Sequence, residues 1–197
     1  YNLDPKLNNK SFRYKNLSYE QLKTMCELGC KVLHPRAIAL AHELGVNLKI
    51  AAAHSDDNHG TQIGVNSDSK GFALNVLNHV LKVDFEQESK INNWESYLSY
   101  KQIPLPRVLH TTKNSVYLTA HSELISYVAQ ALNEWDQSQL KTQFFEAITV
   151  THLSDTSKSH IHQSLESKSV DHFCFSEAPL LSKVYLMEDA KAVIKSL

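Results

Sequence analysis

The stretch Gly29-Cys30-Lys31-Val32-Leu33-His34-Pro35-Arg36 joins two segments that have helical patterns. In the first segment, apolar residues recur every three or four positions, and Ser18 with Gln21 forms the sequence pattern of a capping box. In the second segment, residues 36–44 predict another helix. Because proline disfavours helical backbone in the residue before it, we expect the first helix to end by His34. The stretch is therefore predicted to connect two helices.

Strands follow these two helices. Gly45 is suited to end the second helix, since glycine readily adopts the left-handed conformation found at many helix ends. Residues 46–53 and 61–65 have the pattern of strands, separated by the polar loop His54-Ser55-Asp56-Asp57-Asn58-His59. Two helices followed by strands predict a piece of an α/β domain, and not a whole one.

After a polar turn, the pattern changes to β-α-β-β-α. We expect short strands at 72–78 and 80–86, a helix around Trp94, a hairpin over 108–119 and a helix N-capped by Ser122. The same order of elements then returns, at 147–152, 159–165, 172–175, 183–186 and 190–197. A ferredoxin-like βαββαβ module needs one more strand, and the strand at 72–78 can complete the second unit. The predicted fold class is α+β, with two interlocked modules after the α/β piece.

The composition excludes several classes of protein. With 42% hydrophobic and 21% charged residues and a net charge of −1, the chain has no strong field for nucleic acid or an anionic membrane surface. No apolar run is long enough to span a bilayer. Three cysteines do not make a disulfide framework and fit a reducing cytoplasm. Because the sequence opens without an initiator methionine or a signal-peptide pattern, we expect it to be part of a longer protein.

Four motifs in order resemble those of aspartokinases. The stretch that begins at Gly29 resembles the family's G-A-K-V-L-H-P-R, and Leu17-Ser18-Tyr19-Glu20 is similar to its I-S-Y-x-E. Tyr1-Asn2-Leu3-Asp4-Pro5-Lys6 resembles the end of the family's Y-T-x-D-P-R segment, and Gly60-Thr61 matches the G-T at the end of its kinase domain. The resemblance is tight to about residue 65. It is looser beyond, where residues 113–119 and 184–190 are similar to S-E-x-S-V-x-L-T and F-x-V-x-x-E-D-A.

This resemblance implies two kinds of domain. Residues 1–66 would be the C-terminal segment of an amino-acid-kinase domain, and residues 67–197 a tandem of ACT regulatory modules. The first module would span about 80–136, and the second would combine 72–79 with 137–197. ACT modules of this kind imply a homodimer in the cytoplasm.

The resemblance also implies an activity. Aspartokinases transfer the γ-phosphoryl group of ATP, with Mg²⁺, to the β-carboxylate of aspartate in amino-acid biosynthesis. Tyr1, Lys6, Lys31 and Val32 would line the nucleotide site, with lysine at position 6 where the family has arginine. Spacing alone favours a solvated lysine at position 31 that complements a helix dipole, and the motif reverses this preference. The family's K-x-G-G-T-S motif would lie upstream, so we expect no catalytic residue, no metal ligand and no kinase activity in this chain alone.

Three other groups of residues and one tryptophan have simpler interpretations than a functional site. The 54–59 loop fits neither a zinc nor a calcium pattern and is interpreted as a polar surface loop. Cys26 and Cys30, one helical turn apart, are interpreted as small buried side chains, since no second pair lies nearby. His160 and His162 are interpreted as a solvated pair, and Trp94 as a core residue.

The resemblance predicts that the usual effectors, lysine and threonine, bind weakly or not at all. Lys90-Ile91-Asn92 stands where the family has a glycine-containing turn, and Pro106-Arg107 where it has an acidic or Asn residue. In the second module, Ser157-Lys158-Ser159-His160-Ile161 also lacks glycine. The end product of the pathway stays open, an osmolyte such as ectoine included. The alternative function is a non-catalytic ACT-type module for ligand binding or oligomerisation.

Overall fold

The computed structural model describes residues 1–51, 60–64, 71–135, 140–153, 160–175, 180 and 182–197. The predicted 54–59 loop and most of the 157–161 turn lie outside these residues. In the described part of the chain, no helix is long and apolar enough to cross a membrane.

The N-terminal unit combines two helices with a small sheet. Its strands have the order β1-β3-β2, with β1 parallel and β2 antiparallel to β3. The elements are β1 (Asn16–Leu17), α1 (Tyr19–Glu27), α2 (Pro35–Glu43), β2 (Leu48–Ile50) and β3 (Thr61–Ile63). Ser18 caps α1 through the predicted capping box, because its side chain accepts from the Gln21 amide while the Gln21 side chain accepts from the Ser18 amide.

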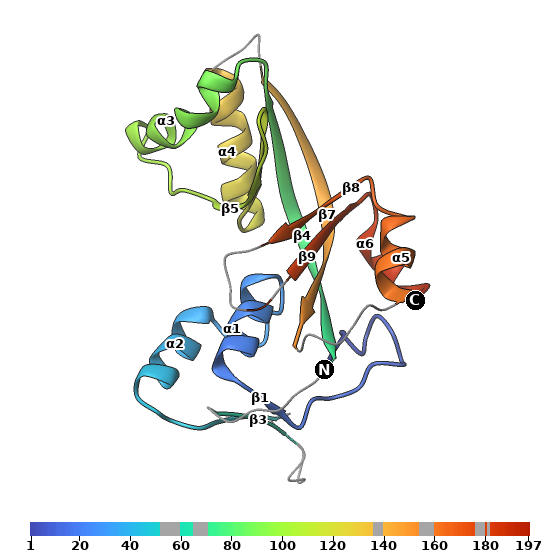
Figure 1. The fold of residues 1–197 in the computed structure, drawn as a ribbon. Helices are drawn as coiled ribbons and strands as arrows, with labels where there is room; N and C mark the ends of the chain where they lie inside the picture. Colours follow the sequence, from blue (N-terminus) through green and yellow to red (C-terminus); the bar gives the residue numbers. More distant parts are fainter. Residues whose placement is uncertain (52–59, 65–70, 136–139, 154–159, 176–179, 181) are drawn as a thin grey trace.

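A single antiparallel sheet of six strands forms the rest of the molecule (Figure 1). Its strand order is β5-β6-β4-β7-β9-β8. The strands are β4 (Phe72–Phe85), β5 (Arg107–Thr111), β6 (Ser115–Thr119), β7 (Leu140–His152), β8 (Asp171–Phe175) and β9 (Ser182–Met187). The helices are the 3₁₀ helix η1 (Glu88–Asn92), α3 (Trp94–Tyr100), α4 (Ser122–Trp135), α5 (His160–Glu166) and α6 (Ala190–Lys195). A mixed α+β fold is thus confirmed.

The two central strands are longer than predicted. The expected strands 72–78 and 80–86 are one strand, β4, whose pairing with β7 shifts register between Leu77 and Val80. Strand β7 begins at Leu140, seven residues before the predicted start at Ala147. The sequence interpretation was wrong here because polar residues interrupt the apolar alternation. In the structure, β4 pairs with β7 on both sides of the register shift, so the strand continues.

The long strands divide the sheet into two parts, which we call half-sheets. The first half-sheet contains β5, β6 and residues 80–85 of β4 with 140–145 of β7. The second contains β8, β9 and residues 72–77 of β4 with 146–152 of β7. Helices α3 and α4 cover the first half-sheet, and α5 and α6 the second (Figure 1).

The sheet is curled, so that its two edge strands meet. His110 of β5 stacks on Phe173 of β8 with ring centroids 4.7 Å apart. The Tyr117 hydroxyl donates to the Asp171 carboxylate at 2.8 Å. Leu28, which follows α1, is fully buried in the apolar cluster on this inner face. The curl therefore gives the end of α1 a surface on which to dock.

Helix α1 ends earlier than the apolar spacing predicts. The helix stops at Glu27, and Gly29 has a φ of +114°. A Cβ atom at Gly29 would lie 2.5 Å from the Val76 carbonyl oxygen of β4, so only glycine allows this approach. The Thr149 hydroxyl donates to the Leu28 carbonyl at 2.8 Å and fixes the same end. Contact with the sheet, and not helical propensity, decides where α1 stops.

Two further helix ends compare directly with prediction. Helix α2 begins at Pro35 after the N-cap His34, and Gly45 follows its end with a φ of +63°, as expected. Helix α4 is capped by His121 and not by Ser122, because the His121 ring nitrogen accepts from the Leu124 amide at 3.3 Å. Histidine was not considered as a cap because serine is the commoner one.

Candidate functional site

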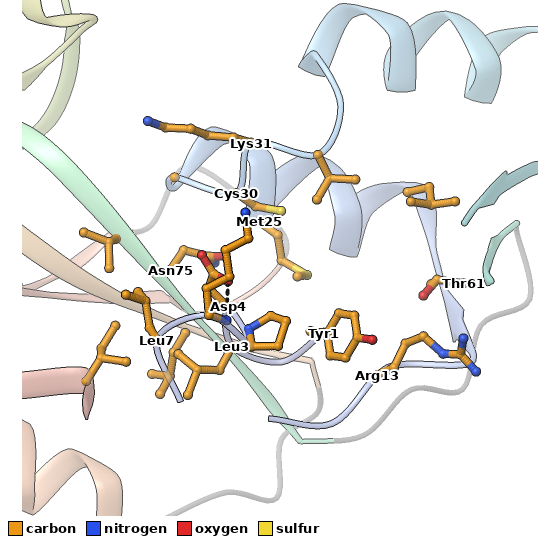
Figure 2. A pocket seen from close by; sticks show the side chains of 18 of the residues that line it. Tyr1, Leu3, Asp4, Leu7, Arg13, Met25, Cys30, Lys31, Thr61 and Asn75 are labelled. Carbon is orange, nitrogen blue, oxygen red and sulfur yellow. Dashed lines mark hydrogen bonds between the residues drawn. The ribbon is translucent and has the colours of Figure 1, made fainter. Parts of the chain in front are cut away.

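A cavity of about 780 Å³ lies where the N-terminal unit meets the second half-sheet. Its wall is formed by the N-terminal segment, the end of α1, strand β4 and helix α6 (Figure 2). This position between two parts of the fold is common for small-molecule sites.

The N-terminal segment, residues 1–13, is held against the sheet by backbone hydrogen bonds. The Leu74 amide donates to the Asn2 carbonyl at 2.7 Å, and the Asn2 amide donates to the Phe12 carbonyl at 2.9 Å. The Asn2 side chain in turn accepts from the Phe12 amide at 2.8 Å. These bonds fix a loop that presents Tyr1 and Lys6 to the cavity.

All four residues predicted for a nucleotide site line this one cavity: Tyr1, Lys6, Lys31 and Val32. They come from two segments that are 25 residues apart in the sequence. The Lys31 side chain extends along the rim, away from Tyr1 and Arg13 (Figure 2). Tyr1 and Val32 are about half exposed, at 55% and 52%. The structure therefore brings the predicted residues together at the mouth of the cavity.

Several polar residues of the wall were not predicted from the sequence. Arg13 and Lys191 add two cations to Lys6 and Lys31, against the single carboxylate of Asp4. This excess of positive charge suits an anionic ligand. Lys191 belongs to α6, so only the tertiary packing brings it to this wall.

Two asparagines on the β4 side of the wall have buried polar atoms without a partner among the described residues. These atoms are the Asn75 side-chain nitrogen and the Asn78 side-chain oxygen. Buried polar atoms are generally hydrogen-bonded, so these two are suited to contact a ligand or water. Asn75 and Asn78 interrupt the apolar pattern of β4, and this is a signal that the sequence did offer.

The remainder of the wall is largely apolar and contains one thiol. Leu17, Leu22 and Met25 face the cavity from the β1–α1 region. A hydrogen bond from the Cys26 thiol lowers the pKa of Cys30 to about 7, although burial opposes this shift. The same hydrogen bond, together with burial, raises the pKa of Cys26. An anionic group with an apolar body would match this combination of surfaces.

A second cluster of titratable groups lies under α5, away from the cavity. His162 shares hydrogen bonds with the Tyr185 hydroxyl and, at 3.0 Å between the Nε2 atoms, with His152. Burial lowers the pKa of both histidines, and Lys183 lowers both further. His162 was interpreted as solvated, and this was wrong because α5 packs its ring against β7 and β9. Among the described residues, no group of three or more side chains could hold a metal ion.

Two other interpretations can be compared with the structure. Trp94 is a core residue, as predicted, with an exposed fraction of 3%. Arg107, aligned with an effector-binding position, forms an ion pair with Glu27 at 3.2 Å and lies over the Phe175 ring. Its charge is therefore engaged within the chain.

The fold, but no sequence family, connects this chain with known proteins. No protein-family model and no curated protein sequence matches it. It superposes on E. coli aspartokinase III bound to aspartate and ADP in the R-state, with a TM-score of 0.71 over 98% of this chain and 48% of that chain, at 16% identity. The Clostridium acetobutylicum aspartate kinase gives a TM-score of 0.69 over 98% of this chain and 50% of that one, at 14% identity.

The same E. coli enzyme in its T-state, with lysine and aspartate, gives a TM-score of 0.66 at 17% identity, over 100% of this chain and 48% of that chain. The chain thus spans about half the length of the aspartate kinases that it matches. Its fold is that of about half of an aspartate kinase, and the resemblance first seen in the motifs is confirmed at the level of the fold.

Proposed function

We propose that this chain is the C-terminal regulatory and assembly part of an aspartate kinase, and that its cavity is one wall of the nucleotide site. The observation that carries the proposal is the convergence of Tyr1, Lys6, Lys31 and Val32 on one cavity. Those residues were selected from motifs alone. The fold shared with aspartate kinases supports the same assignment independently.

The wall has surfaces for each part of a nucleotide. Tyr1 offers an aromatic face, and Val32 with the apolar residues behind it offers contact for a base. Lys6, Lys31, Arg13 and Lys191 would bind the phosphates through charge-assisted hydrogen bonds. ATP would supply the phosphoryl group, and aspartate would bind to a part of the enzyme outside this chain. We place no Mg²⁺ ligand on the chain.

Calorimetry with ADP tests the nucleotide site. ADP should bind the wild-type chain, and Lys31→Ala should weaken binding about tenfold or more, because it removes a charge-assisted contact. Lys195→Ala is the matched control, since Lys195 is also an exposed lysine but does not line the cavity. The assignment fails if ADP does not bind, or if both variants bind like the wild type.

A kinase assay tests whether this chain alone can transfer phosphate to aspartate. Because phosphoryl transfer depends on several cations placed around the phosphates, the chain alone should show no aspartate-dependent release of ADP. Turnover above background would show that the chain holds a whole active site and would overturn the assignment of residues 1–66 to a kinase segment.

We further propose two interlocked ACT modules of the ferredoxin-like type. In the first half-sheet, β4, β5, β6 and β7 are strands 1, 2, 3 and 4 of a βαββαβ module. Their order across the sheet is then 4-1-3-2, as in the ferredoxin-like fold. In the second half-sheet, β7, β8 and β9 are strands 1, 2 and 3, and β4 supplies strand 4. The order across the sheet is again 4-1-3-2. This exchange of strands supports two interlocked modules, and it extends the first from about 80–136 to about 80–145, because its fourth strand is residues 140–145 of β7. The second module would combine about 72–79 with 146–197.

ACT modules of this kind are proposed to form a homodimer. Apolar side chains exposed on the first half-sheet and its helices, such as Phe144 and Tyr127 at 52% and 55%, suit such an interface. Light scattering should give a mass near twice 22.3 kDa. A monomer at tens of micromolar protein would contradict the dimer.

Lysine and threonine are proposed not to act as tight effectors. The turn Lys90-Ile91-Asn92 lies in η1 and carries side chains where the family's turn has glycine. Arg107 replaces an acidic or Asn residue, so the ammonium group of an effector would lose its partner, at a cost of roughly 2–5 kcal/mol. Calorimetry that detects either amino acid binding below about 100 µM would contradict this proposal.

A further inference from the structure

Two cysteines meet at the end of α1. The Cys30 amide donates to the Met25 carbonyl at 2.9 Å, and the Gly29 amide donates to the Cys26 carbonyl at 3.4 Å. With Gly29 in positive φ, this is the pattern of a Schellman cap. The cap turns residue 30 back over the last turn of the helix. Cys26 and Cys30 therefore lie next to each other, and the interaction of their thiols is the largest cause of the shifts in their pKa values.

The two thiols have different surroundings. Cys30 lines the cavity, and its sulfur is visible in the wall (Figure 2). Cys26 does not line the cavity, although both cysteines pack, partly buried, against the apolar cluster of the N-terminal unit. Because the hydrogen bond lowers the pKa of Cys30 to about 7 and raises the pKa of Cys26, the cavity-facing sulfur is the one that ionises first. Of the two neighbouring thiols, that of Cys30 is therefore the stronger acid.

We propose that Cys30 and Cys26 are a peroxide-responsive thiol pair in the cavity wall, which is converted into an intramolecular disulfide. The Cys30 thiolate attacks one oxygen of hydrogen peroxide, an S–O bond forms, the O–O bond breaks and hydroxide leaves. The Cys26 sulfur then attacks the sulfenic sulfur of Cys30, loses its proton, and the S–O bond breaks with release of water. In sum, two thiols and one peroxide give one disulfide and two water molecules.

The disulfide would alter the cavity in two ways. It would tie the last turn of α1 to the residue that precedes Lys31, and it would remove a negative charge from a wall that carries Lys6 and Lys191. Oxidation of the two thiols would therefore change the shape and the charge of the cavity wall, whichever anionic ligand binds there. The inference does not depend on the nucleotide assignment.

Peptide mass spectrometry tests the disulfide directly. Cleavage by trypsin after Lys23 and Lys31 leaves Cys26 and Cys30 in one peptide, residues 24–31. After treatment of the wild-type chain with hydrogen peroxide and then N-ethylmaleimide, this peptide should be lighter by two hydrogen atoms and carry no maleimide. Oxidation of Met25 would add an oxygen atom and is distinguished by mass. Cys174→Ser, which removes an exposed cysteine, should give the same product.

The outcomes that would overturn the proposal are equally specific. One is a 24–31 peptide that keeps two alkylated thiols while Cys174 is oxidised. Another is a cross-link between two copies of the chain in place of the intramolecular bond. A third is oxidation of Cys30 to sulfinic acid without any disulfide.

Substitution of Cys26 tests the hydrogen bond separately. Cys26→Ala removes the donor, so alkylation of Cys30 by iodoacetamide at pH 7 should slow roughly threefold, after allowance for the greater nucleophilicity of a more basic thiolate. Cys26→Ser keeps a hydroxyl donor and should react about as fast as the wild type, yet it cannot form the disulfide. Equal alkylation rates in wild type and Cys26→Ala would contradict the pairing.

Discussion

The two half-sheets have the same strand order but bury their helical faces differently. The first is covered by α3 and by α4, which is 14 residues long. Among the described residues, the core under these two helices contains only side chains of its own strands, helices and connections. The second is covered by α5 and α6, of seven and six residues, and its core also contains Leu3 and Leu7 of the N-terminal segment. The helical face of the first half-sheet is thus complete in itself among the described residues, whereas that of the second is completed by a distant part of the chain.

This difference connects the second half-sheet with the cavity. The N-terminal segment that fills its core also lines the cavity, and the Asn8 side chain donates to the Ile194 carbonyl of α6 at 3.1 Å. A ligand that orders residues 1–8 would therefore stabilise the second half-sheet and leave the first unaffected. By reciprocity, a change in the second half-sheet would alter binding in the cavity.

The largest effect is expected in the self-contained core of the first half-sheet. Leu132 of α4 is fully buried there, so Leu132→Ala should destabilise the chain by about 3–5 kcal/mol through lost burial and a cavity. Urea unfolding measures this loss. Ser126→Ala, at an exposed position of the same helix, is the control and should cost less than about 1 kcal/mol. If both variants lower the free energy of unfolding by similar amounts, the buried face of α4 does not stabilise this core.

A smaller, localised effect is expected for Leu3→Ala. Leu3 is 7% exposed and packs in the core of the second half-sheet, so its truncation should cost about 2 kcal/mol. Hydrogen exchange should show the loss in β9 and α6, with α4 unchanged, since local stability follows local contacts. Equal loss of protection in α4 would mean that the half-sheets unfold as one unit and would break the comparison.

The sequence predicted those parts of the fold that local chemistry decides. The capping box at Ser18, the end of α2 at Gly45 and the hairpin of β5 and β6 each depend on residues within a few positions of one another. The continuity of β4 and the early end of α1 could not be predicted in this way. Both depend on partners more than 40 residues away, β7 for the strand and Val76 for Gly29.

The residues of the candidate site also fall into those that local sequence predicted and those that tertiary packing brings in. Tyr1, Lys6, Lys31 and Val32 were identified by resemblance, because they lie in motifs that are contiguous in sequence. Lys191, Asn75 and the thiol of Cys30 join the wall only through the packing of α6, β4 and the end of α1. No periodicity or spacing within the sequence relates residue 191 to residue 6. The dependence of the second half-sheet on the N-terminal segment was missed for the same reason.

A third prediction concerns the contact of α1 with the second half-sheet. Gly29→Ala would place a methyl group against the Val76 carbonyl in an unfavourable φ region, at an expected cost of about 1–3 kcal/mol. Gly45→Ala is a matched control, because Gly45 also has positive φ but nothing lies within 4 Å of the added atom. It should cost about 1 kcal/mol. If thermal unfolding shows equal losses, the close approach to β4 contributes nothing beyond backbone strain.

The smallest effect is expected from pH, and it should again separate the half-sheets. His152 and His162 lie in the second half-sheet, and burial lowers their pKa values below the ordinary 6.5. Lys183 lowers both further, while Glu166 partly opposes the shift of His162. Below pH 6.5 the unfolded chain therefore binds more protons at these positions than the folded chain does. Stability that is fully present above pH 6.5 is lost as the pH falls through the lowered pKa values.

Hydrogen exchange at pH 7 and pH 5 measures this loss. Protection, corrected for the intrinsic exchange rates, should fall at pH 5 in α5 and β9, which hold His162 and its partner Tyr185. Helix α3 should keep its protection, because it carries no histidine and packs in the hydrophobic core of the first half-sheet. His162→Gln, which retains a polar side chain but does not titrate, should reduce the difference between the two pH values in α5. An equal fall in α3 and α5, or an unchanged difference in His162→Gln, would place the pH dependence elsewhere.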